Sequence, residues 1–172
     1  NSIWLAGDFI RTSGNLIQNN NASYLRLDAI GATPAFDPQG ENFRGIIVDA
    51  PGSVYRAQSD FSAANVYMQI EDGEFCLNGN TLTFNSNNNH IEVNGGILNV
   101  DTASSILFNG NNQQLNINGG VFKLVGSSSA TASLSRNTGT FAVNQNGGVL
   151  HAQYYQVRNG NFVLTGGTID AT

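Results

Sequence analysis

Charged residues are scarce in this sequence. Only 11% of its 172 residues are Asp, Glu, Lys or Arg, less than half of the roughly 25% found in ordinary soluble domains. The single lysine and six arginines form no basic stripe, and the net charge is −5. Neutralising a row of phosphates requires such a stripe, and so does attraction to an anionic membrane. We therefore expect no nucleic-acid partner and no electrostatic binding to membranes.

Cysteine and long apolar runs are also scarce. The one cysteine, Cys76, excludes an internal disulfide and cannot make a zinc site by itself. Because Cys76 lies between Phe75 and Leu77, the sequence predicts a small packed side chain in a strand. No apolar run approaches the roughly 18 residues of a membrane-spanning helix. We expect no direct membrane span and no cofactor.

Asparagine and glycine take the place of the missing charges. The sequence contains 25 asparagines and 20 glycines, and 40% of its residues are hydrophobic. This composition differs from the highly charged, weakly hydrophobic one that is typical of disordered chains. Amides and hydroxyls must therefore solvate the surface. Such a surface suits a protein that works outside the cell, beside carbohydrate or other polar neutral material.

A repeat recurs in the second half of the sequence. Each copy combines alternating apolar residues with a Gly-Gly pair, and the copies cover residues 91–100, 115–124, 141–150 and 162–169. A weaker copy covers residues 74–84. The pairs begin at residues 95, 119, 147 and 166, so their spacings are 24, 28 and 19 residues. In the third copy Gln145 stands where the other copies have an apolar residue, which predicts a bulge or a one-residue insertion.

Each copy predicts two short strands joined by a sharp turn. Glycine supplies backbone with positive φ at little steric cost, and the candidate structural turn residues are Gly95, Gly96, Gly119, Gly120, Gly147, Gly148, Gly166 and Gly167. Local pattern alone is typical of β-hairpins. The recurrence instead favours the corners of an all-β fold, a right-handed parallel β-helix (β-solenoid), in which each strand stacks on the next coil. The alternative is an antiparallel β-sandwich or meander.

The first part of the sequence is less regular. All three prolines lie between Gly31 and Gly52, which predicts a protruding loop over residues 31–44 followed by a strand. Residues 62–70 are the best candidate for a helix and are equally consistent with a strand. We therefore expect an irregular N-terminal β region over residues 1–72, with irregular coils and this long loop, and a Gly-Gly repeat solenoid over residues 73–172. An N-glycosylation acceptor pattern covers residues 21–23.

Both ends of the sequence lack the features of a solenoid cap. An apolar strand is expected directly after Asn1, and residues 166–172 begin a strand pair without an amphipathic helix beyond it. Because an uncapped solenoid leaves unpaired backbone groups at its end, we expect the solenoid to continue beyond the chain. Its partners would then be the rest of a longer parent chain or a secretion or surface complex.

The acidic residues do not form a catalytic pattern. Glycosidases need two carboxylates roughly 5 to 9.5 Å apart, and calcium sites need six to eight oxygen ligands. After Glu74 the only acids are Glu92, Asp101 and Asp170, at least nine positions apart. The denser stretch over residues 71–74 predicts a turn and lacks the spacing of a calcium loop. We assign no catalytic, cofactor-binding or metal-binding residue and expect no enzyme, unless stacking brings these three acids into a shared groove with aromatic walls.

Histidine, asparagine and tyrosine offer further candidates. His90 and His151 lie in different copies and are expected to be exposed strand residues. Asn94, Asn118 and Asn146 each precede a glycine of the repeat, so that stacking in register would form a ladder of amide hydrogen bonds. The alternative role for these asparagines is contact with carbohydrate, beside a tyrosine. The candidate ligand contacts are Tyr154 and Tyr155, and the other tyrosines are Tyr24, Tyr55 and Tyr67.

The repeat form apolar-x-apolar-x-Gly-Gly-apolar-apolar-x-apolar resembles the repeats of very large secreted adhesins of gliding and other Bacteroidota bacteria. It resembles those of autotransporter passenger domains more loosely. The resemblance covers roughly residues 73–172. It implies a non-catalytic, extracellular segment of a bacterial cell-surface protein, an adhesive or structural stalk with a role in adhesion or gliding motility and export by type IX secretion. The alternative is a polysaccharide-active enzyme or carbohydrate-binding module on a β-helix, with carbohydrate as the partner.

Overall fold

The computed structural model describes residues 3–14, 24–64 and 67–171. Within these ranges the chain forms twenty strands and no helix. Every strand pairing in them is parallel, with long crossovers between paired strands. This pairing excludes the antiparallel sandwich and confirms the solenoid. Asn1 and the acceptor pattern at residues 21–23 lie outside the described residues.

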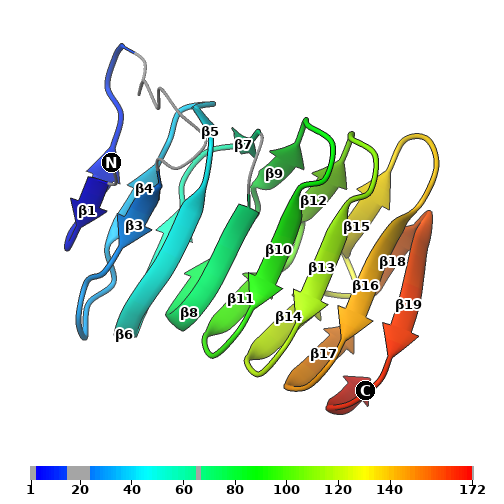
Figure 1. Ribbon diagram of the computed structural model, residues 1–172. Helices are drawn as coiled ribbons and strands as arrows, with labels where there is room; N and C mark the ends of the chain where they lie inside the picture. The colour runs from blue at the N-terminus through cyan, green and yellow to red at the C-terminus, as the bar shows by residue number, and fades with distance from the viewer. Residues whose placement is uncertain (1–2, 15–23, 65–66, 172) are drawn as a thin grey trace.

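The strands form three faces of a coil with about seven turns (Figure 1). The first face holds β1 (Ile3–Leu5), β3 (Leu25–Leu27), the first parts of β6 (Ile46–Ala57) and β8 (Tyr67–Cys76), β10 (His90–Val93), β13 (Gln114–Ile117), β16 (Phe141–Gln145) and β19 (Gly160–Leu164). The second face holds β2 (Phe9–Ile10), β4 (Ala35–Asp37), the later parts of β6 and β8, β11 (Ile97–Val100), β14 (Val121–Val125), β17 (Val149–Gln153) and β20 (Thr168–Ala171). The third face holds β5 (Asn42–Phe43), β7 (Phe61–Ala63), β9 (Thr81–Phe84), β12 (Ser105–Phe108), β15 (Ala132–Arg136) and β18 (Tyr155–Arg158).

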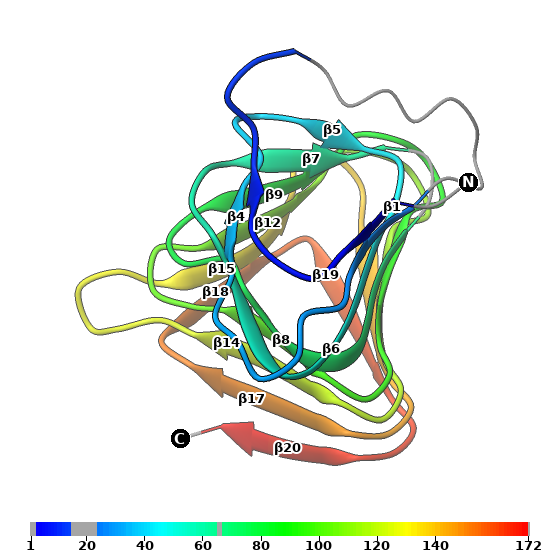
Figure 2. The same ribbon diagram turned by 90° about the vertical axis from the view of Figure 1, so that its left-hand side faces the viewer.

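The coil is right-handed. Seen from its N-terminal end in Figure 2, the chain winds clockwise as it recedes from the viewer. The three faces enclose a roughly triangular cross-section. We call the turn from the first to the second face the first corner, the next turn the second corner, and the return to the first face the third corner.

The register follows the spacing of the Gly-Gly pairs. Ile91 pairs with Leu115, Leu115 with Val143, and Val143 with Phe162. Successive coils therefore take 24, 28 and 19 residues, the same values as the spacings of the glycine pairs. The variation lies outside the strands, in the turns that connect the faces.

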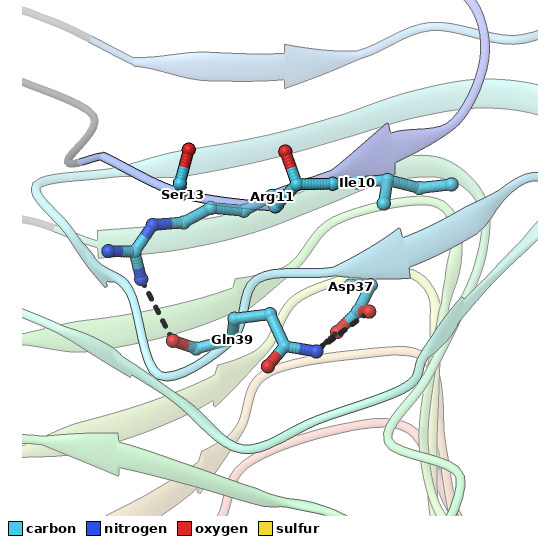
Figure 3. Close-up of a pocket in the computed structure, with 6 residues that line it drawn as sticks. Ile10, Arg11, Ser13, Asp37 and Gln39 are labelled. Carbon is cyan, nitrogen blue, oxygen red and sulfur yellow. Dashed lines mark hydrogen bonds between the residues drawn. The ribbon is translucent and has the colours of Figure 1, made fainter.

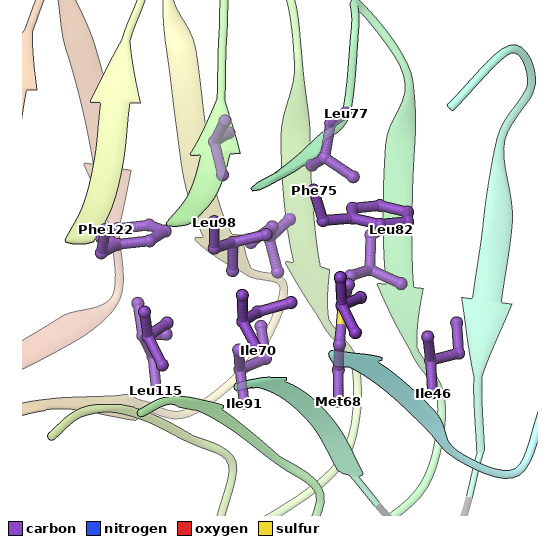
Figure 4. Packing of buried hydrophobic residues seen from close by; sticks show 14 of the residues in the cluster. Ile46, Met68, Ile70, Phe75, Leu77, Leu82, Ile91, Leu98, Leu115 and Phe122 are labelled. Atoms are coloured by element: carbon purple, nitrogen blue, oxygen red, sulfur yellow. The ribbon is translucent and has the colours of Figure 1, made fainter. Parts of the chain in front are cut away.

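One hydrophobic core runs along the inside of the coil, because alternate side chains of each strand point inward. Figure 4 shows this packing, in which Ile46, Met68, Ile91 and Leu115 form one column of paired positions. The alternation of apolar residues in the repeats predicts that Leu98, Val100, Phe122, Leu124, Leu150 and Ile169 point into this core, and the first five are buried. Ile169 is the exception, at 47% exposed, since no further strand of the described chain packs beyond β20.

The segment expected as a protruding loop belongs to the wall of the coil. Residues 31–44 contain β4 and β5, and Phe36 and Phe43 are fully buried. The two rings lie 5.6 Å apart and pack with Phe61. The candidate helix at residues 62–70 is also replaced by strands in the structure, because β7 ends at Ala63 and β8 begins at Tyr67.

The bulge predicted at Gln145 is absent. Asn144 pairs with Asn116 and Gln145 with Ile117 in continuous register, so Gln145 takes an inward position without an insertion. Its side chain is 1% exposed, and its Nε2 donates a hydrogen bond to the Thr168 carbonyl at 2.8 Å. This bond satisfies an amide in an otherwise apolar column, which explains how the register is maintained.

The alignment of the weak copy at residues 74–84 is wrong, because that segment belongs to another corner. In the structure Gly95 lies over Glu71, and Gly96 lies over Asp72 and Gly73. Residues 71–73 are therefore the first corner of the preceding coil, whereas Asn78-Gly79 turns from the second face to the third. The acidic stretch is a corner, as its expected turn indicated.

Candidate functional site

The first corner requires glycine mainly because successive coils approach closely. A Cβ at Gly95 would lie 2.5 Å from the Glu71 carbonyl oxygen, and one at Gly166 would lie 2.6 Å from that of Asn146. The same collision, closer than 3 Å, occurs at all eight expected turn glycines. Positive φ, the reason expected from sequence, applies only to Gly148 and Gly167 among them. These residues are structural.

The predicted asparagine ladder is present at the first corner. Asn118 Nδ2 donates to Asn94 Oδ1 and Asn146 Nδ2 donates to Asn118 Oδ1, each at 2.9 Å. Asn94 Nδ2 in turn donates to Glu71 Oε1 at 2.8 Å, and Thr165 Oγ1 contacts Asn146 Oδ1 at 3.2 Å. We call this row the corner ladder. Its amides are used in coil-to-coil bonds, so their first role is structural.

Further rows of stacked asparagines were not predicted from the sequence. At the third corner Asn109 Nδ2 donates to Asn85 Oδ1 and Asn137 Nδ2 donates to Asn109 Oδ1, both at 3.1 Å. On the first face Asn144 Nδ2 donates to Asn116 Oδ1 at 2.8 Å. Their spacing of 24 and 28 residues, the coil lengths, is the signal that could have identified them.

The three acids proposed as an enzymatic alternative lie on different parts of the coil. Glu92 is on β10 of the first face and accepts a bond from Gln69 Nε2 at 2.6 Å. Asp101 follows β11 at the second corner, where it accepts bonds from Ser104 Oγ and from the Gly79 amide. Asp170 is on β20 of the second face. They share no groove, and the described residues contain no His, Cys, Asp and Glu cluster suited to a metal ion.

Both histidines are half-buried on outward positions of strands. The His90 ring stacks on Tyr67 with centroids 5.4 Å apart, and Tyr67 packs against Tyr24 at 5.3 Å. His151 Nδ1 lies 2.8 Å from Asp170 Oδ2, because the two residues are paired in register. The sequence did not indicate this His–Asp pair. It resembles the base and orienting group of a hydrolytic triad only in part, because a nucleophile is also required.

Cys76 is a buried packing residue, as predicted. Its side chain is 1% exposed, and burial together with the charge of Asp101 raises the pKa of the thiol to about 11. Arg56 Nη1 lies 3.6 Å from the sulfur. Because the thiolate is the nucleophilic form, this cysteine is unsuited to catalysis near neutral pH.

The two tyrosines proposed as ligand contacts are exposed. Tyr154 is 52% and Tyr155 is 49% exposed, and Tyr155 lines a cavity of about 240 Å³ whose other walls are apolar side chains such as Phe162 and Ile169. Tyr55 is instead buried, with its hydroxyl 3.1 Å from the Leu5 carbonyl oxygen. The structure thus separates two accessible phenols from the three that pack.

A polar cleft of about 430 Å³ lies beside the N-terminal coils (Figure 3). Arg11 Nη1 donates to the Gln39 carbonyl at 2.8 Å, and Arg11 Nε lies 3.1 Å from Glu41 Oε2. Asp37 accepts bonds from Ser59 Oγ and Gln39 Nε2, which lower the pKa of its carboxyl group. These groups satisfy one another, and the geometry gives them a structural role.

No protein-family model, curated protein or solved structure matches this chain. Among the described residues no helix is long and apolar enough to cross a membrane.

Proposed function

We propose that this chain is a non-catalytic segment of a large secreted bacterial cell-surface protein, in which it serves as an adhesive or structural stalk. Its neighbours would be further coils of a parent chain or a secretion or surface complex. Adhesion or gliding motility, and export by type IX secretion, are the roles implied by the resemblance of its repeats.

The uninterrupted stacking along one axis is the observation that carries this proposal. Parallel pairing connects consecutive coils on all three faces, from β1 to β20. Each coil contacts only the coils beside it, and each adds about 4.8 Å of length. The corner ladder adds side-chain bonds in the same direction. Such an arrangement supplies length and rigidity, which a stalk requires.

The surface chemistry supports the same role. From β11 to β17 the outward strand positions are filled mainly by amides, hydroxyls and aliphatic groups, such as Asn99, Ser105 and Val121. Glu92, Asp101 and Asp170 are dispersed over different faces and corners. A glycosidase needs two carboxylates on opposite sides of one bond, so this dispersal favours a stalk over the enzyme.

Two measurements test the proposal. In single-molecule stretching between the two ends, we expect stepwise loss of coils at forces above those that unfold a globular control domain of equal length. Incubation with neutral or acidic polysaccharides, with and without calcium, should release no reducing ends or unsaturated sugars. Low-force unfolding in one step would contradict a load-bearing role, and sugar release abolished by substituting one acid would favour the enzyme.

A further inference from the structure

The third corner contains a cleft of about 680 Å³ that is separate from every group considered above. Its walls come from the turn after β12, from β13 and β16, from the turn after β15, and from β19. The polar lining is Asn111, Asn112, Gln113, Gln114, Arg136, Thr140 and Asn161. Four of these seven side chains are amides that lie at the surface, so the rim offers both donors and acceptors.

Arg136 is the unusual member of this cleft. It ends β15 at an inward position, paired with Phe108, which itself pairs with Phe84. A guanidinium therefore continues a column of phenyl rings. The residue is only 6% exposed, its Nη2 donates to Asn111 Oδ1 at 2.7 Å, and its Nη1 donates to the Thr140 carbonyl. Its Nε is buried without a partner in the described structure.

The charge of Arg136 is not compensated by a nearby acid. No carboxylate of the described residues forms an ion pair with it. Between Asp101 and Asp170 the sequence contains no Asp or Glu, while it contains Lys123, Arg136 and Arg158. A buried cation is costly unless an anion approaches it. The stretch from residue 102 to residue 169, which includes the coil of Arg136 and the coil after it, carries only positive formal charges, and this favours an anion from outside.

A second buried group supports the assignment. Gln113 is 1% exposed and lines the cleft; its Nε2 donates to the Ser86 carbonyl, and its Oε1 has no partner in the described structure. The site therefore combines an unpartnered donor with an unpartnered acceptor. At the rim, Gln114 and Asn161 are exposed and form no side-chain bond within the described ranges.

We propose that this cleft binds an acidic sugar, with the carboxylate of a uronic acid held by Arg136 and its hydroxyls bonded by Gln113, Gln114 and Asn161. Guanidinium donors match a carboxylate in geometry and charge, whereas amides serve hydroxyls as donor and acceptor. The volume lies within the range of roughly 300 to 1,000 Å³ that is typical of small-molecule sites. This inference goes beyond the proposed stalk, and neither depends on the other.

The test is calorimetric titration of the whole chain with a trigalacturonate, with its methyl-esterified counterpart and with inorganic phosphate. We expect trigalacturonate to bind and the ester and phosphate to bind at least roughly tenfold more weakly, because the ester lacks the charge and phosphate lacks the sugar hydroxyls. Arg136→Gln should weaken trigalacturonate binding roughly 10- to 100-fold.

Arg136 is buried, so rim substitutions guard against misfolding. The double substitution Gln114→Ala with Asn161→Ala removes two exposed amides and should weaken binding roughly 5- to 50-fold. Gln156→Ala, an exposed glutamine of β18 outside the cleft, is the matched control and should bind as the original chain does. Absence of binding, equal binding of acid and ester, or unchanged affinity of the double variant would overturn the proposal. Phosphate binding as tight as that of trigalacturonate would overturn the assignment to a sugar.

Discussion

Glycines of the first corner lie against backbone carbonyls of the coil before them. At Gly120 the atom nearest to an added Cβ would be the carbonyl oxygen of Gly96, while the φ of Gly120 is an ordinary one. A larger residue there is excluded by its neighbour and not by its own backbone. The distance between successive coils at this corner thus depends on pairs of residues that are one coil apart in the sequence, such as Gly96 and Gly120.

Gly120→Ala should therefore destabilise the chain. The added methyl group collides with backbone of the adjacent coil, which has little freedom to move, and overpacking of this kind costs roughly 1–3 kcal/mol. Gly7→Ala is the matched control, because no atom lies within 4 Å of its Cβ position. Urea denaturation compares the two variants, and equal midpoints would show that the corner tolerates a Cβ.

Stability should fall at alkaline pH. The pKa of Cys76 is raised to about 11, mainly by burial, and that of Tyr67 to about 12, again mainly by burial. A group whose pKa is raised on folding contributes stability that is complete below its unfolded pKa and is lost as the pH rises through its folded pKa. For Cys76 this window extends from about pH 9 to about pH 11.

Cys76→Ala isolates the contribution of the thiol. The variant should lose less stability between pH 9 and 11 than the original chain, whatever its stability at pH 7. Urea midpoints over this range provide the measurement. Parallel pH profiles for the two chains would contradict a contribution from Cys76.

At the scale of the strand, deleting the same side chain should cost more stability at a buried position than at an exposed one. Phe122 of β14 is fully buried, whereas Phe162 of β19 is 44% exposed. Phe122→Ala should cost roughly 3–5 kcal/mol, as expected for deleting a buried ring, and Phe162→Ala should cost much less. Chemical denaturation showing a loss below about 1 kcal/mol for Phe122→Ala would mean that this face is not core.

The corner ladder should not tolerate a carboxylate in its middle. Asn118→Asp replaces the donor to Asn94 Oδ1 by an acceptor, which should cost about 0.5–1.5 kcal/mol at neutral pH. Below about pH 4 the new carboxyl group is protonated and again able to donate, so part of the loss should be recovered. Gln156→Glu introduces the same charge on β18 outside the ladder and should show no such recovery in thermal melts.

The regular strands were predictable and the short early ones were not. Gly-Gly pairs with alternating apolar neighbours predict the stacked strands of the second half, because the same residues determine both turn and face. In residues 31–44, Pro34 and Pro38 are typical of a loop, and β4 and β5 are only three and two residues long. The sequence therefore did not indicate these two strands. Residues 71–73 form the same corner as Gly95-Gly96, but only the register reveals it.

The candidate sites could be predicted less well than the strands, because most of them form only when strands pair in one particular register. The corner ladder was predictable, because its asparagines precede recurring glycines. His151 and Asp170 belong together only once β17 is paired with β20. Arg136 is inconspicuous among six scattered arginines, although the alternation Ala132, Leu134, Arg136 already indicates an inward guanidinium. Pairing across coils brings together side chains, such as those of His151 and Asp170, that lie far apart in the sequence.

Across the whole molecule, stability should vary with position along the axis. Coils between β8 and β17 have a neighbour on each side, whereas residues of β19 and β20 are almost all exposed. In a structure held by nearest-neighbour contacts, exchange is slowest in the middle. Hydrogen exchange should therefore be slow for β10, β11 and β13 and fast for β19 and β20. Uniform protection would contradict this profile and indicate one cooperative unit.

All the hydrogen bonds of the corner ladder point the same way along the coil, and this bears on how the coil can be lengthened in evolution. Each asparagine in it passes a hydrogen bond toward the N-terminus, and Glu71 accepts the last one with no proton to pass on. A member that both accepts and donates can be copied without leaving a partner unmatched. Tandem duplication of residues 94–117, one coil, would therefore lengthen the rod by one coil and leave every asparagine of the ladder with both of its partners.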